Sequence, residues 1–577
     1  MRRLSALLAC FAICLPAAAA HAAAAGVHGA VSSVASTNSE APIPVAASPT
    51  PPAGRKLSSD RVIEIASALA KMRAVRAKYP GSYGDAYLKV PLRWQVSFFT
   101  RTGGKEIGQV IIADSTGRVL EQWTGFQIAW TMARGYRGAF ARHVNSLYVW
   151  LPLCALFILP FLNYRRPLSL LNLDLIVLLC FSISLAFFNH ANIYASVPLV
   201  YPPLLYLLAR MLALARPGRK ALPLPDPRPL RLLVPAPWLA LGVVFLIGFR
   251  IALNVTDSNV IDVGYAGVIG AQRIVKDEPL YGSYPSDNEH GDTYGPVNYE
   301  AYVPFEQIFG WSGTWDDLPA AHAAAIVFDL LATALLFLLG RRMRGPTLGI
   351  ALAYAWVSYP FTLFAMNSNS DDTLVAVLVL GALLLAGSAP ARGVLAALAG
   401  LTKLAPLALA PVLATHGLWT GQARGARRRA RALLAFCGAF ALTAAVVSIP
   451  ALRHDSLHTI YERTLVYQAN RGSPFSLWGL YGLHGLETGV EIAAIALAVL
   501  LAVVPRRADV VGLAAACAAV MIAVQLGVEH WFYLYIPWFF GLVMVALLGR
   551  FSDPSRPPAV VASAPARSSR PALAPSR

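Results

Sequence analysis

The chain has 577 residues, of which 56% are hydrophobic and only 14% are charged. Soluble domains carry about 25% charged residues, so this composition excludes an ordinary soluble protein and indicates a polytopic membrane protein. The net charge of +18 does not predict nucleic-acid binding, because the arginines lie in short clusters between apolar runs, as in the cytoplasmic loops of membrane proteins.

The first 55 residues have the features of an export signal and a tether. Arg2 and Arg3 precede a short apolar stretch and an alanine-rich end near Ala22, which predicts a cleaved signal peptide over residues 1–23. A first transmembrane helix is the weaker alternative, because the apolar stretch is too short. Residues 24–55 are rich in alanine, serine and proline and predict a disordered linker.

Residues 56–127 predict a small exported α+β domain. Helical spacing runs from Leu57 to Tyr79, and alternating segments near 94–100, 106–113 and 118–123 predict three strands. This order of helix and strands resembles the PepSY-like modules. The domain contains no nucleophile or metal-binding cluster, so we expect a binding or regulatory module. Residues 128–145 place arginines among aromatic residues and predict an amphipathic helix lying on the membrane surface.

From residue 146 onward, apolar runs long enough to span a bilayer recur. We predict about eleven spans, near 146–163, 170–188, 193–214, 232–250, 320–340, 347–366, 373–389, 432–449, 486–504, 510–528 and 531–549. The first three spans and a cytoplasmic loop form an accessory unit over 146–230, and residues 231–550 form the core. Residues 551–577 predict a disordered cytoplasmic tail. The expected fold is an all-α polytopic protein of the bacterial plasma (inner) membrane, with the N-terminal domain extracytoplasmic.

One apolar segment does not fit a single crossing. Residues 394–416 have arginines on both sides, which makes both flanks cytoplasmic, so we predict a broken hairpin with Lys403 near its tip. The alternative is a lysine that extends from an ordinary helix end toward the interface. Asp329 lies inside a predicted span, and we expect it to pair with a neighbouring helix.

Three loops are predicted on the outer face, at 251–319, 367–372 and 450–485. They hold many carboxylates together with arginines, histidines and aromatic residues. Such a set suits a carboxylate base, a lipid phosphate and a sugar ring.

The motifs in these loops resemble those of the GT-C glycosyltransferases. The similarity is closest to the actinobacterial polyprenyl-phosphate-mannose-dependent mannosyltransferases, which are glycosyltransferase family 87-like. It covers about residues 235–550 and rests on segments whose order and shared outward placement match: Asp262-Val-Gly-Tyr265, Pro279-Leu-Tyr-Gly282, Tyr294-Gly-Pro-Val-Asn-Tyr299, Gly400-Leu-Thr-Lys403 and Ser473-Pro-Phe-Ser-Leu-Trp478. The first loop departs from the wider pattern because it has no Asp-x-Asp pair.

The resemblance implies an inverting transfer in which a first-loop aspartate removes the proton of the acceptor hydroxyl. Asp262 holds the matching position, and Asp257 is the second candidate. The alternative for Asp262 is a capping role for a helix that begins near Val263. A carboxylate in a desolvated site would also have a raised pKa, which suits a base.

The remaining site candidates are cations and aromatic residues. We expect Arg463, Arg471 and Lys403 to bind the donor phosphate, although Arg463 is as well explained by anchoring to anionic membrane lipids. Tyr265, Tyr281 and Trp478 are candidate sugar platforms. His530 is a further substrate-binding candidate, with an aromatic belt as its alternative setting.

No cofactor is predicted. The six cysteines lie in the signal or in apolar runs, which leaves no cysteine-based metal site. The pairs Asp371-Asp372 and Asp316-Asp317 have the hard oxygen ligands that a divalent ion prefers, but such pairs are more often loop ends or helix caps.

The sequence therefore favours a glycosyltransferase. It would move a sugar, mannose first, from a polyprenyl-phosphate donor to an envelope glycolipid or glycan on the extracytoplasmic face. A lipid or glycolipid transporter and a membrane sensor with an exported ligand-binding module are the alternatives. Charge inside the spans is scarce and the inner loops are short, which disfavours both.

Overall fold

The computed structural model describes residues 42–135, 140–216, 230–285, 288–313, 315, 318–418, 425–504 and 506–551. The predicted signal peptide, residues 24–41 of the predicted linker, the pair Asp316-Asp317 and the predicted tail from residue 552 lie outside this part of the chain.

The N-terminal module (residues 42–124) is a five-stranded antiparallel meander with the strand order β1-β2-β3-β4-β5. The strands are β1 (Ile43–Val45), β2 (Tyr83–Lys89), β3 (Arg93–Phe99), β4 (Glu106–Ala113) and β5 (Val119–Thr124). Helices α2 (Ser59–Ser67) and α3 (Ala70–Lys78) pack Val62 and Met72 against Trp94 and Phe98 of β3. The three predicted strands are confirmed as β3, β4 and β5, and the single predicted helix is two.

The predicted linker boundary is wrong at its C-terminal end. Residues 43–45 form an edge strand that pairs with β2, where proline is tolerated because one side of an edge strand needs no partner. The Arg55 side chain donates to the Arg93 carbonyl at 3.1 Å, and the backbone N–H of Lys56 donates to Asp114 at 2.9 Å. The folded module therefore begins at about residue 43 and not at residue 56.

The predicted surface helix over 128–145 is also wrong. The connecting segment (residues 125–145) contains only the short helices α4 (Phe126–Ala129), η2 (Thr131–Arg134) and η3 (Arg142–Asn145) among its described residues. Gly125 and Gly135 adopt φ of +65° and +57°, values that interrupt a helix. The aromatic residues Trp130 and Phe140 pack against the helical bundle instead of facing lipid.

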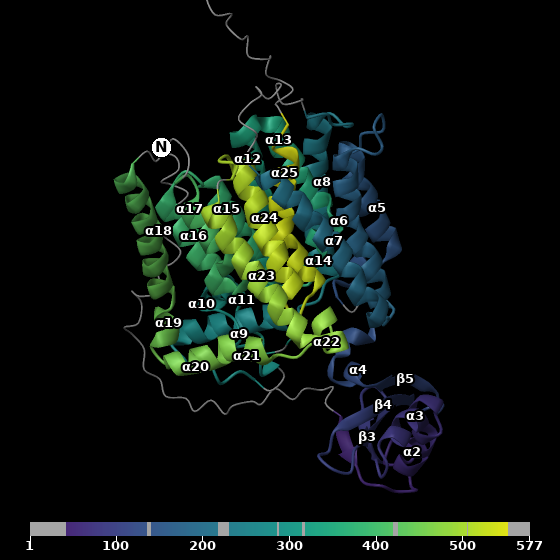
Figure 1. The fold of residues 1–577 in the computed structure, drawn as a ribbon. Helices are drawn as coiled ribbons and strands as arrows, with labels where there is room; N and C mark the ends of the chain where they lie inside the picture. Colours follow the sequence, from purple (N-terminus) through teal and green to yellow (C-terminus); the bar gives the residue numbers. More distant parts are fainter. Residues whose placement is uncertain are drawn as a thin grey trace, which may run out of the picture.

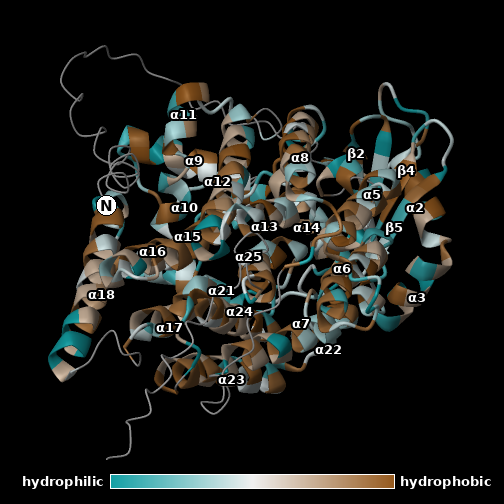
Figure 2. Ribbon diagram, turned by 90° about the horizontal axis from the view of Figure 1, so that it is seen from above, coloured by the Kyte–Doolittle hydropathy of each residue, from teal (hydrophilic) through white to brown (hydrophobic). Residues whose placement is uncertain are grey.

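The rest of the described chain is a helical membrane bundle (Figure 1). Seven helices are long and apolar enough to cross a membrane, and they match seven predicted spans: α6 (Leu170–Asn189), α7 (Ile193–Ala215), α8 (Ala236–Thr256), α12 (Pro319–Arg344), α18 (Ala426–Val447), α23 (His484–Val503) and α24 (Val510–Gly527). Several leucines, isoleucines and valines of α23 are exposed, as expected for a lipid-facing helix. Figure 2 colours much of this helix as hydrophobic. The chain is a multi-pass helical membrane protein.

Four predicted spans take other forms. Helices α13 (Pro346–Ser358) and α14 (Pro360–Asn367) make a pair bent by 58°, and Pro360 explains the break because the residue before proline disfavours helix. Helices α5 (Leu147–Ile158), α15 (Asp372–Leu384) and α25 (Ile536–Leu548) are shorter than a full crossing. The total of eleven crossings stays a prediction.

The predicted broken hairpin is present. Helix α16 (Ala389–Thr402) ends at Lys403, and the chain returns through η6 (Ala405–Leu409) and α17 (Ala410–Thr415). The Arg392 guanidinium donates to the carbonyls of Leu413 at 2.8 Å and His416 at 3.1 Å, which ties the two open ends together. Lys403 therefore lies at the closed tip.

The predicted outer loops are largely helical. Residues 251–319 contain α9 (Asp262–Lys276), α10 (Pro296–Glu300) and α11 (Val303–Phe309). Residues 450–485 contain α20 (Leu457–Tyr461), η8 (Glu462–Val466), α21 (Tyr467–Asn470) and α22 (Leu477–Tyr481), after the short α19 (Ile449–Leu452). Figure 1 shows these helices at the end of the bundle from which the N-terminal module extends.

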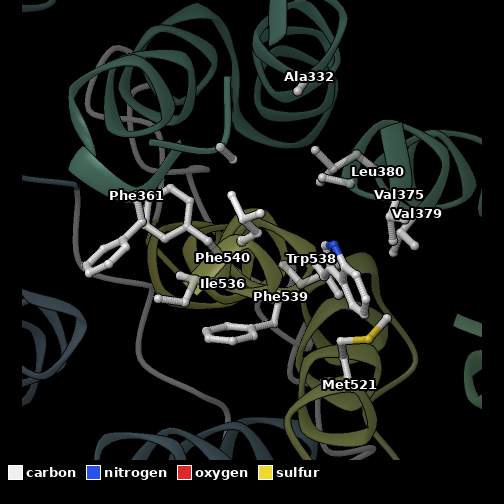
Figure 3. Close-up of a cluster of buried hydrophobic side chains, with 14 of the residues drawn as sticks. Ala332, Phe361, Val375, Val379, Leu380, Met521, Ile536, Trp538, Phe539 and Phe540 are labelled. Carbon is white, nitrogen blue, oxygen red and sulfur yellow. The ribbon is translucent and has the colours of Figure 1, made fainter. Parts of the chain in front are cut away.

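Helix α25 is buried inside the bundle along its whole length. Its Phe540 stacks on Tyr359 with ring centroids 4.0 Å apart, and Trp538 and Phe539 are buried. Figure 3 shows the indole nitrogen of Trp538 directed toward the helix that carries Val375 and Val379. That nitrogen donates to Asp372 at 3.1 Å, so the apolar core supports a polar cluster at the start of α15.

A buried ion pair joins α8 to α12. Arg250 and Asp329 form a bidentate contact, with Nε 3.0 Å from Oδ2, and Trp356 donates to the same carboxylate at 2.8 Å. The expected pairing of Asp329 is confirmed, and the pair has its hydrogen bonds satisfied, which favours a structural role.

We expect Arg250→Ala to lower the free energy of unfolding by about 3–5 kcal/mol, because it leaves the Asp329 carboxylate buried without a counter-charge. Denaturation of the purified protein in mixed micelles measures this loss. The double variant Arg250→Met with Asp329→Leu removes both charges and should recover most of the stability. Equal losses in the single and double variants would show that the charges are not the cause.

Candidate active site

Two loops that are far apart in the sequence, around residues 259–264 and 367–372, lie side by side at the candidate site. The backbone N–H of Ile261 donates to the Ser368 carbonyl at 3.2 Å, and the Asn369 amide donates to the Asn259 carbonyl at 3.0 Å. A Cβ at Gly264 would lie 2.0 Å from the Asn369 carbonyl oxygen, so glycine is required for this close approach. The contact places Asp262 beside the Asp371-Asp372 pair.

Lys403 neutralises part of that acidic pair. Its ammonium lies 2.9 Å from Asp371 and 2.7 Å from Asp372, and both carboxylates are buried. The rings of Tyr294, Tyr535 and Trp538 surround the ammonium at 5.4–5.8 Å. A Cβ at Gly295 would lie 1.9 Å from the Leu401 carbonyl oxygen, and this close approach brings Tyr294 to the hairpin tip.

Asp262 is the accessible carboxylate of this group. It is exposed, whereas its neighbours Ile261 and Val263 are buried. Desolvation by the surrounding protein raises the pKa of Asp262, while Arg471, the Val263 N–H and Lys403 oppose the rise and Asp372 adds to it. Arg471 and Lys403 therefore both belong to the electrostatic surroundings of Asp262.

Asp262 is not the N-cap of α9, although it does stabilise the first turn of this helix. Ile261 occupies the N-cap position of α9, and Asp262 is the first helical residue. Its carboxylate accepts a hydrogen bond from the Val263 N–H, which stabilises the first turn. This contact leaves other lone pairs of the carboxylate available.

Arg471 is a cation without a carboxylate partner among the described residues. Its guanidinium lies 5.7 Å from the Trp130 ring, and it interacts electrostatically with Tyr294, Tyr535 and Asp262. Neighbouring His530 is held neutral, because burial and then the charges of Arg471 and Lys403 keep the pKa of His530 well below its usual range. Its Nδ1 lies 2.9 Å from the Ser473 hydroxyl.

Two predicted site residues have structural partners instead. Asp257 lies 2.7 Å from the His143 ring and accepts from the His143 backbone at 3.0 Å, so it anchors the connecting segment. Arg463 lies 3.5 Å from Asp292, whose side chain is fully buried. Neither side chain joins the group around Asp262.

The three residues predicted as sugar platforms have buried rings in this structure. Tyr265 packs on Trp315 with centroids 4.7 Å apart. The Tyr281 hydroxyl donates to the Tyr294 carbonyl at 2.9 Å, and Trp478 donates to the Leu526 carbonyl at 3.0 Å.

The partly exposed aromatic residues beside the charges are others: Trp130, Tyr294, Tyr467 and Tyr535. Tyr294 begins one of the quoted motifs, so a broader reading of that motif would have included it. No local pattern marked Trp130.

Of the two acidic pairs considered for a divalent ion, only Asp371-Asp372 lies among the described residues. The ammonium of Lys403 forms salt bridges with both carboxylates of this pair, in the place that a metal ion would take. Among the described residues, the ligand atoms of His484, Glu487 and Glu529 lie within 4.8 Å of one another, but His484 and Glu487 already pair at 3.3 Å.

One protein-family model matches the part of the chain that contains most of these site residues. Residues 293–528 match the model of glycosyltransferase family 87. The matched region contains Asp371, Asp372, Lys403 and Arg471, whereas Asp262 and the connecting segment precede it. No curated protein matches the chain. The family match and the apolar helices indicate a GT-C-like membrane glycosyltransferase, which takes a sugar donor and an acceptor.

Proposed function

We propose that this protein transfers mannose from a polyprenyl-phosphate donor to an envelope glycolipid or glycan, on the extracytoplasmic face and with inversion of the anomeric centre. The observation that carries the proposal is an exposed carboxylate, Asp262, in the electrostatic surroundings of Arg471, a cation that forms no salt bridge within the described part of the chain. The family 87 match favours this reading over a transporter or a sensor.

In the proposed step, an acceptor hydroxyl oxygen attacks the anomeric carbon while the bond from that carbon to the phosphate oxygen breaks. Asp262 takes the hydroxyl proton, and the phosphate leaves with the bonding electron pair. Arg471 compensates the charge that grows on the phosphate, since a guanidinium binds phosphate oxygens in a bidentate manner. A single displacement inverts the centre.

The cations divide into two roles. Arg471 binds the phosphate, because Arg463 and Lys403 are already paired with carboxylates. Lys403 keeps the two buried carboxylates in place next to Tyr294 and Trp538. The neutral imidazole of His530 and the partly exposed rings of Tyr294 and Tyr535 are suited to contact the sugar.

We place the site on the extracytoplasmic face because of the position of the N-terminal module and of the arginine cluster at the end of α12. The N-terminal module and the site helices lie at the same end of the bundle (Figure 1). The arginine cluster Arg341, Arg342 and Arg344 ends α12 and follows the positive-inside pattern for a cytoplasmic end.

Membranes that contain the protein test the proposal when they are supplied with radiolabelled polyprenyl-phosphate mannose. We expect label to appear in a larger glycolipid or glycan, with release of polyprenyl phosphate. The same membranes without the protein are the control. Label that stays on the donor, under conditions in which the donor is bound, would contradict the proposed reaction.

The pH dependence of transfer follows from the environment of Asp262. Its pKa is raised by desolvation and lowered by Arg471, and a base must be deprotonated, so activity should fall as the pH drops through that pKa. Arg471→Met removes a lowering charge, and the acidic limb of kcat/KM should move to higher pH. If the acidic limb of the pH profile stays in place or moves to lower pH, Arg471 does not lower the pKa of the catalytic base.

A further inference from the structure

The connecting segment forms a continuous link between the N-terminal module and the site. On the module side, the Arg134 guanidinium lies 5.7 Å from the ring of Trp123 in β5. The same guanidinium donates to the carbonyls of Gln127 at 2.8 Å and Ile128 at 3.1 Å. Residues 126–134 therefore form one compact unit attached to the last strand of the sheet.

On the bundle side, the segment is held at several points. A Cβ at Gly135 would lie 2.2 Å from the Ala191 nitrogen, so the chain there lies directly against the turn between α6 and α7. The Ala141 N–H donates to the Asn259 side chain at 2.8 Å, and the Phe140 ring lies 4.8 Å from Phe532. The contact with Asn259 is only three residues from Asp262.

Between these anchors, Trp130 contacts three side chains of the site. Its ring centroid lies 5.4 Å from that of Phe475 and 5.6 Å from that of His530, and the Arg471 guanidinium is 5.7 Å away. Trp130 belongs to a part of the chain that precedes the family 87 match by more than 160 residues, from 130 to 293. These contacts therefore bring a residue from outside the matched region to the candidate phosphate cation.

We propose that Trp130 is a positioning residue of the transferase site and that the N-terminal module is, through it, a working part of the enzyme. The inference rests on the proposed function, because it assigns Arg471 to the donor phosphate. An indole face is the strongest cation–π partner, so it holds the guanidinium in one orientation without neutralising its charge. A carboxylate in that place would compete with the phosphate, whereas an aromatic ring does not.

The test compares three variants of the full-length protein in lipid nanodiscs. Trp130→Ala should raise KM for polyprenyl-phosphate mannose about 3- to 30-fold, the range that one partly desolvated cation–π contact supports. The fall in kcat should be no larger than the rise in KM, because Arg471 keeps its charge and Asp262 is unchanged. Trp130→Phe retains an aromatic face and should recover most of the affinity. Trp238→Ala is the matched control, since Trp238 is 66% exposed on α8.

A second measurement separates this inference from the proposed function. Binding of sugar-free polyprenyl phosphate is measured by native mass spectrometry, and Trp130→Ala should weaken it by the same factor as KM. Wild-type affinity in Trp130→Ala would overturn the inference even if sugar transfer is confirmed. Equal losses in Trp130→Ala and Trp130→Phe, with equal loss of thermal stability, would overturn it by showing a packing role alone. A wild-type protein that binds polyprenyl phosphate and transfers no sugar would contradict the proposed function, while the binding comparison still decides the role of Trp130.

Discussion

Asp262→Asn is expected to slow sugar transfer by about 10²–10⁴-fold, the contribution of a general base. The amide has the shape of the carboxylate but cannot accept the acceptor's hydroxyl proton. It can still accept the hydrogen bond from the Val263 N–H, so α9 should keep its first turn. We expect the affinity for the donor to change little, and single-turnover assays on the purified protein measure the chemical step directly.

The same variant separates catalysis from capping. Asparagine supports a helix N-terminus about as well as aspartate does, so a residue that only stabilises α9 would tolerate the change. Asp257→Asn is the matched control, because Asp257 precedes α9 but pairs with His143. If Asp262→Asn transfers sugar at a rate within about threefold of wild type, Asp262 is not the base. Removal of a general base slows a reaction by much more than threefold.

Lys403→Ala should have the second largest effect, and on both stability and activity. It leaves the buried carboxylates of Asp371 and Asp372 without the ammonium that lies 2.9 and 2.7 Å from them. Breaking a buried ion pair in this way costs about 3–5 kcal/mol. Activity should fall with the loss of order in the site, and both quantities are measured on protein purified in the same lipid.

The acidic pair also predicts the response to metal. Because an ammonium already lies between the carboxylates, EDTA should leave wild-type activity unchanged. Millimolar Mg²⁺ should restore part of the stability of Lys403→Ala, since two carboxylates offer the oxygen ligands that Mg²⁺ prefers. Adding Asp371→Asn to the variant removes one buried charge and should restore stability without Mg²⁺. Wild-type activity that is lost in EDTA and returns with Mg²⁺ would contradict this role of Lys403.

The errors of the sequence analysis share one physical origin. Residues 43–45 have the composition of a tether, yet they pair with β2 because an unpaired strand edge was available to them. Tyr265, Tyr281 and Trp478 lie within motifs that resemble a glycosyltransferase, and each is buried by neighbours from another segment. Whether an aromatic ring faces a substrate or a core depends on those neighbours.

The membrane class, the positions of the long apolar helices, three strands of the N-terminal module and the hairpin around Lys403 were all predictable from the amino-acid sequence. These features depend on the length of apolar runs, the alternation of side chains and the placement of arginines, all of which are local. The sequence also named Asp262 and Arg471. Three further features became visible in the folded chain: Asp262 and Arg471 share one electrostatic environment, Lys403 binds Asp371 and Asp372, and Trp130 lies against Arg471. The reason is that these contacts join segments separated by 31 to 341 residues, from 372 to 403 and from 130 to 471, and no local pattern records which distant segments pack together.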